Sequence, residues 1–113
     1  MTASEETVGQ ILQLIEEKKG EQTVVLDLED APWGTDFFVL TGADNPKQLR
    51  AIAENIRKGL DAEPFAVEGL NSKTWIVLDY GDVIVHVLDR RARQFYDLEG
   101  LWDERVIEAA GDR

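Results

Sequence analysis

Cysteine is absent from the 113-residue chain, which excludes disulfide bonds, thiolate-bound zinc and cysteine nucleophiles. Histidine occurs once, as His86, so a metal site built from several histidines is excluded too. No apolar stretch approaches the roughly 20 residues that a membrane-spanning helix needs. Residues 1–20 are acidic and amphipathic, unlike a secretory signal. We therefore expect a soluble, cytoplasmic protein with no metal and no other cofactor.

Basic residues are scarce: 12 Lys and Arg stand against 23 Asp and Glu, a net charge of −11. Nucleic-acid binding draws much of its affinity from cationic side chains that displace counterions around phosphates. The chain is therefore poorly suited to hold RNA or DNA alone and well suited to approach a basic protein. The alternative is that most of these acids only solvate the surface.

Motifs of common enzyme classes are also missing, since there is no G-x-S-x-G elbow and no P-loop. The best enzymatic case is a metal-dependent nucleotidyltransferase, with magnesium held by aspartates at predicted strand ends: Asp27, Asp36, Asp79 and Asp82. However, the Gly-Ser pair and the D-x-D carboxylates of that class are absent. We favour local roles, with Asp44 or Asn45 capping a helix and Asp79 and Asp82 flanking a turn.

Hydrophobic periodicity predicts one α/β domain over residues 1–113, a sandwich with a mixed sheet of about five strands flanked by helices. The predicted helices are 4–19, 46–60, 90–96 and 98–110, and the predicted strands are 23–28, 36–41, 65–68, 75–79 and 82–88. Thr2 or Ser4 caps the first helix and Gly20 ends it. A Pro-Trp-Gly turn lies at 32–34, and Gly42 ends the second strand.

The last two strands form a hairpin, for which Tyr80-Gly81 is the expected turn. In that register Trp75 faces His86 and Val77 faces Ile84. Alternation then gives two faces. One is wholly aliphatic and should meet the helices: Ile76, Leu78, Val83, Val85 and Val87. The other is mixed, with Trp75, Val77, Ile84, His86 and Leu88. The mixed face fits a surface that a partner covers, or a sheet buried on both faces with His86 hydrogen-bonded inside the monomer.

Three arginines form the only basic cluster, Arg90, Arg91 and Arg93, on a short helix capped by Asp89. They form a solvated helix face or give a supporting contact to RNA phosphate.

Three stretches together resemble the ribosomal silencing factor (Iojap) family: TDFFVLTG, QLRAIAENI and VEGLNSKTWIVLDYGDVIVHVLDRRARQFYDLEGLW. The resemblance runs from about Val8 to Trp102, and its last motif is long and specific. The chain departs from the family pattern at Phe37, where Tyr is common, and at Ala43-Asp44, where Asn-Ser is more usual.

The resemblance implies a degenerate nucleotidyltransferase-like fold without catalytic residues, and a protein that is not an enzyme. It implies a translational repressor that binds the large ribosomal subunit through a protein of the L-fourteen family. Subunit joining is thereby blocked when nutrients fail, and free members are homodimers. The implied partner-binding residues are Trp75, Val77, Tyr80, Ile84, His86 and Tyr96, with Phe95 beside them. For Phe95, Leu98 and Leu101, helical spacing favours packing against the sheet instead.

Overall fold

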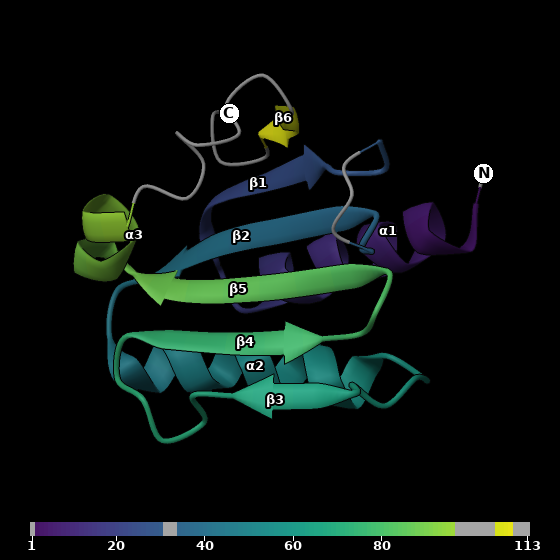
Figure 1. Ribbon diagram of the computed structural model, residues 1–113. Coiled ribbons are helices and arrows are strands. Elements are labelled where there is room, and N and C mark those ends of the chain that lie inside the picture. The colour runs from purple at the N-terminus through teal and green to yellow at the C-terminus, as the bar shows by residue number, and fades with distance from the viewer. Residues whose placement is uncertain (1, 31–33, 97–105, 110–113) are drawn as a thin grey trace.

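The computed structural model describes residues 2–30, 34–96 and 106–109, which form one mixed sheet with helices packed on it (Figure 1). In chain order the elements are α1 (Ala3–Glu17), β1 (Glu21–Asp27), β2 (Phe37–Ala43), α2 (Pro46–Gly59), β3 (Ala66–Glu68), β4 (Trp75–Asp79), β5 (Val83–Asp89), α3 (Arg90–Tyr96) and β6 (Val106–Ala109). The strand order is β3-β4-β5-β2-β1-β6, and only the β2–β5 pair is parallel. The predicted α/β fold with a mixed sheet is confirmed.

Helices α1 and α2 cover one face of the sheet (Figure 1). The apolar stripe of α2 is fully buried at Leu49, Ile52, Ala53 and Ile56, as its spacing predicts. The aliphatic face of the hairpin meets these helices in the same core: Ile76, Leu78, Val83, Val85 and Val87 are at most 1% exposed. None of the described helices is long and apolar enough to cross a membrane.

Capping residues begin the helices where the sequence predicts. The Thr2 side chain accepts a hydrogen bond from the Glu5 N–H, and the Glu5 carboxylate accepts one from the Thr2 N–H. Asn45 caps α2, and Asp89 accepts from the Ala92 N–H at 2.7 Å to start α3. Helix α1 ends earlier than predicted, because its last turn closes at Lys18 and Lys19 takes the left-handed conformation expected of Gly20.

One predicted strand boundary and part of one predicted helix are wrong. Gly42 does not end β2, which continues through Ala43 because Gly42 pairs with both Glu21 and Leu88. Val106–Ala109 is not helical as predicted for 98–110 but is a sixth strand, antiparallel to β1. The open edge of β1 offers unpaired backbone groups, and β-branched Val106 and Ile107 suit a strand. The remainder of that helix prediction, and Pro32 and Trp33 of the predicted turn, lie outside the described residues.

The β4–β5 hairpin has a different turn from the one predicted. Asp79 pairs with Ile84, Val77 with His86 and Trp75 with Leu88, so Gly81 and Asp82 form the turn. The Tyr80 N–H donates to the Val83 oxygen at 2.9 Å, and Gly81 has a φ of 86°, which glycine adopts without strain. The register is shifted by two residues, so every side chain keeps its predicted face.

Candidate partner-binding site

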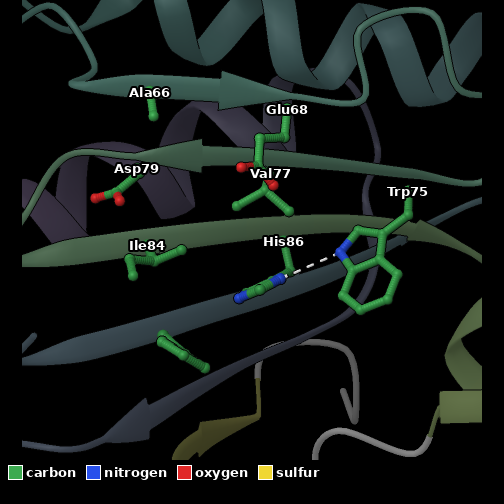
Figure 2. A pocket seen from close by; sticks show the side chains of 8 residues that line it. Ala66, Glu68, Trp75, Val77, Asp79, Ile84 and His86 are labelled. Carbon is green, nitrogen blue, oxygen red and sulfur yellow. Dashed lines mark hydrogen bonds between the residues drawn. The ribbon is translucent and has the colours of Figure 1, made fainter. Parts of the chain in front are cut away.

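A hollow of about 320 Å³ lies on the sheet face opposite α1 and α2 (Figure 2). We call it the hairpin hollow. Its lining includes Phe38 of β2, Trp75 and Val77 of β4, and Ile84 and His86 of β5. The structure thus brings together four of the six predicted partner-binding residues. Trp75, Val77 and Ile84 are half-buried, whereas His86 is only 8% exposed.

His86 has one hydrogen-bond partner and one unpaired nitrogen. The Trp75 Nε1–H donates to His86 Nδ1 at 3.2 Å (Figure 2), so the proton of the neutral ring lies on Nε2. That Nε2 is buried and has no hydrogen-bond partner. The ring also packs on Phe38, with centroids 4.8 Å apart. Burial lowers the pKa of His86 to about 4, so the ring is neutral at pH 7.

Two carboxylates lie along the β3 side of the hollow (Figure 2). Glu68 is exposed, and Asp79 accepts a hydrogen bond from the Gly81 N–H at 2.8 Å. Among the residues that the structure describes, neither carboxylate has an ion-pair partner. The hollow therefore combines an apolar floor, one buried donor and an acidic rim.

Tyr80 does not line the hollow, and the side chain of Tyr96 lies outside the described residues. Tyr80 packs against the core cluster on the helix side of the sheet, its hydroxyl is buried without a partner, and burial raises its pKa. Even-numbered residues of β4 face the helices, and Tyr80 continues that series. Tyr96 ends α3, but its side chain and those of Phe95, Leu98 and Leu101 lie outside the described residues.

The three arginines do not form one cationic surface. Arg90 forms ion pairs with Glu21 at 3.1 Å and Asp44 at 2.6 Å, and its hydrogen bonds to Glu21 raise its pKa. Arg93 is buried and donates to the backbone oxygen of Glu21 at 3.2 Å. Arg91 is exposed. The cluster is thus largely used in holding α3 to the start of β1.

The predicted alternative of a magnesium-binding aspartate set finds no support in the geometry. Asp36 accepts from the Ser4 hydroxyl at 2.9 Å, and Asp27 accepts from the Glu29 N–H at 3.0 Å. Asp79 and Asp82 flank or form the hairpin turn, as the local interpretation predicts. Within the described part of the chain, no three His, Cys, Asp or Glu side chains are placed to hold a metal ion.

Comparison with known proteins identifies the family. The family described as "Ribosomal silencing factor during starvation" matches residues 1–112. The chain belongs to this family. The ribosomal silencing factor of Halalkalibacterium halodurans is 31% identical over 113 residues, which cover 96% of this chain and 97% of that protein. The one from Bacillus subtilis is 34% identical over 95 residues, or 81% and 80% of the two chains.

A solved structure shares the fold. A crystal structure of a Chromobacterium violaceum protein superposes with a TM-score of 0.86 at 27% identity, covering 90% of this chain and 88% of that one. As a ribosomal silencing factor, the protein blocks the joining of ribosomal subunits and is not an enzyme. The predicted block of subunit joining is confirmed, and the nucleotidyltransferase alternative is wrong. Binding through a protein of the L-fourteen family stays a prediction.

Sequence reasoning missed two features of the hollow, Phe38 and Glu68. Phe38 lies beside His86 because β2 and β5 pair in parallel, which no local pattern reveals. Glu68 lies on the short edge strand β3, whose sequence does not indicate which face of the sheet the side chain is on. Only its pairing with Val77 of β4 places it on the face of the hollow. A third missed feature is Phe65, which is 82% exposed next to the hairpin turn.

Proposed function

We propose that the protein blocks subunit joining by binding a ribosomal protein of the L-fourteen family on the face of the large subunit that meets the small one. The hairpin hollow is the contact surface. The observation that carries this proposal is a set of half-buried apolar side chains around one buried donor that lacks a partner. Interfaces concentrate such aromatic and aliphatic anchors at their centre, with polar groups around them.

Charge supports a protein partner over direct contact with RNA. A net charge of −11 attracts a basic ribosomal protein and repels the phosphate backbone. Arg90 and Arg93, the obvious phosphate ligands, are engaged within the monomer. A protein that acts in this way shares the compartment of the ribosomes, which in a bacterium is the cytoplasm.

A homodimer of the free protein is part of the same proposal. Two copies that met through the hairpin hollow would cover its apolar floor until a ribosome is available. Such a dimer and the ribosomal complex would then be mutually exclusive. Sedimentation of the free protein measures the dimer independently of ribosome binding.

The test compares Val77→Glu with Gln13→Glu in co-sedimentation with separated large and small subunits. Val77 is half-buried in the hollow, whereas Gln13 is exposed on α1, and both changes add one negative charge. We expect the wild type and Gln13→Glu to sediment with the large subunit only. Val77→Glu should bind roughly thirtyfold more weakly, because a carboxylate would lose its hydration in the interface.

Thermal unfolding of both variants must accompany the binding assay, since an unfolded variant also fails to bind. Equal binding of the wild type to both subunits would contradict the large-subunit assignment. A folded Val77→Glu variant that binds like the control would remove the hollow from the contact.

A further inference from the structure

We propose that the hairpin hollow takes up a basic segment of the ribosomal partner, in which a backbone carbonyl oxygen accepts from His86 Nε2 and a Lys or Arg side chain reaches Glu68 and Asp79. This inference rests on the proposed function and specifies the chemistry that the site recognises. It makes His86 and the two carboxylates determinants of specificity.

The buried imidazole donor carries the first half of the inference. His86 Nδ1 is occupied by the Trp75 indole, which leaves Nε2–H as the group that needs an acceptor. A buried donor without an acceptor destabilises the state in which it occurs. Because Nε2 has almost no exposed surface in the free protein, a side chain at the floor of the hollow must shift before an oxygen of a bound segment can complete this hydrogen bond. Binding would then remove a penalty that the free protein carries.

The carboxylates carry the second half. Glu68 pairs with Val77, and Val77 pairs with His86, so the three side chains form a row across β3, β4 and β5. Neighbouring strands lie about 4.8 Å apart, which places Glu68 roughly 10 Å from His86. A Lys or Arg side chain and the side chain of Glu68 together cover such a distance, with the aliphatic stem of the Lys or Arg on Val77 and its charge at Glu68.

Asp79 extends the acidic rim on the same face. It pairs with Ala66 of β3 and Ile84 of β5, one step along the sheet from the first row. These two carboxylates have no cationic partner in the part of the chain that the structure describes. Next to an apolar floor, they repel a phosphate backbone and attract a basic peptide. The chemistry of the hollow therefore favours a protein segment over RNA.

Three proteins test the inference against a purified L-fourteen-family protein: the wild type, His86→Phe and the double variant Glu68→Gln/Asp79→Asn. The control is Glu16→Gln/Asp61→Asn, which removes the same two charges at exposed positions that do not line the hollow. We expect roughly tenfold weaker binding for His86→Phe, which leaves the partner's oxygen unpaired. The rim variant should bind about threefold to tenfold more weakly than the control.

A measurement on the wild type avoids any loss of folding in the variants. In the protein labelled at its single histidine, the Nε2–H proton signal should shift downfield when the ribosomal protein is added. If the wild type binds without this shift, and both hollow variants bind like the control, the inference is overturned and the proposed function stands. If the wild type does not bind at all, the proposed function fails with it.

Discussion

At the scale of single residues, His86 shows how a local pattern leaves two interpretations open. Alternation along β5 places it away from the helices, but alternation cannot tell whether that face is covered. The structure shows a histidine that is buried and bonded to Trp75 within the monomer, yet still lacks a partner for its second nitrogen. The structure thus confirms that His86 is buried and hydrogen-bonded inside the monomer, while contact of this face with a partner stays a prediction.

The pKa of His86 predicts a pH dependence of stability. Its folded pKa of about 4 lies below the ordinary histidine value of 6.5, so the unfolded chain binds the extra proton first as pH falls. The contribution of neutral His86 to the free energy of unfolding is fully present above pH 6.5, declines as pH falls from 6.5 to 4, and is lost below pH 4. The total is about 3 kcal/mol, since one pKa unit corresponds to about 1.4 kcal/mol.

Urea unfolding between pH 7 and pH 4.5 measures this effect, and His86→Phe is the control because the chain has no other histidine. The wild type should lose more stability than the variant over that interval. Parallel pH profiles for the two proteins would show that His86 titrates normally and is not desolvated.

The arginines show what residue-level reasoning from sequence cannot reach. Arg90 and Arg93 looked like a cationic helix face, but their partners lie far along the chain, at Glu21 and Asp44. Because α3 leads directly out of β5, its first turn reaches the start of β1 and the end of β2. Only the sheet order, which brings these ends together, reveals the pairing.

At the scale of elements, the sequence was most informative where one face meets the helices. The apolar stripe of α2 and the aliphatic face of the hairpin are buried as predicted. Apolar residues that repeat every 3.6 positions in a helix, or every 2 in a strand, lie on one side of the element and so indicate which side is buried. The hairpin turn was less predictable. Glycine can occupy either central position of a two-residue turn, so Tyr80-Gly81 and Gly81-Asp82 were both compatible with the sequence.

A pair of glycine substitutions tests the turn that leads from β3 to β4. Gly69 has a φ of 81°, and a Cβ there would collide with the backbone oxygen of Trp75. Gly69→Ala should therefore lower the free energy of unfolding by about 2 kcal/mol or more. Gly9→Ala in α1 is the matched control, because no atom outside the neighbouring backbone of α1 lies within 4 Å of the added methyl group. It should stabilise the protein by up to about 1 kcal/mol.

Chemical unfolding of both variants gives the two free energies. Because Trp75 is the first residue of β4, Gly69→Ala should also weaken binding to the large subunit, whereas Gly9→Ala should not. A Gly69→Ala variant as stable as the wild type would show that this turn relaxes easily and does not fix the position of Trp75.

At the scale of the whole molecule, the two faces of the sheet have separate roles. The helix face carries the larger core, which α1, α2 and the sheet share, and the opposite face carries a smaller core cluster of Val24, Leu26, Leu28 and Leu40 beside the hollow. The opposite face carries the hairpin hollow with its acidic rim (Figures 1 and 2). The fold class followed from the order of predicted elements. The hollow did not, because it depends on β3 and β2 flanking the hairpin, and both are placed by long-range pairing.

This division predicts how ribosome binding responds to salt. If the hollow binds a basic protein segment, one or two ion pairs at Glu68 and Asp79 contribute, and affinity for the large subunit should fall only modestly between 50 and about 200 mM salt. A contact dominated by RNA, with six to ten phosphates neutralised, would lose affinity by roughly a thousandfold or more over that range.

Co-sedimentation across a salt series, with the wild type and Arg91→Gln, distinguishes the two cases. Arg91 is exposed, so its loss should lower the salt slope by about one if it contacts a phosphate and leave the slope unchanged otherwise. A steep slope that Arg91→Gln reduces would place α3, and not the hollow, at the centre of the ribosomal contact.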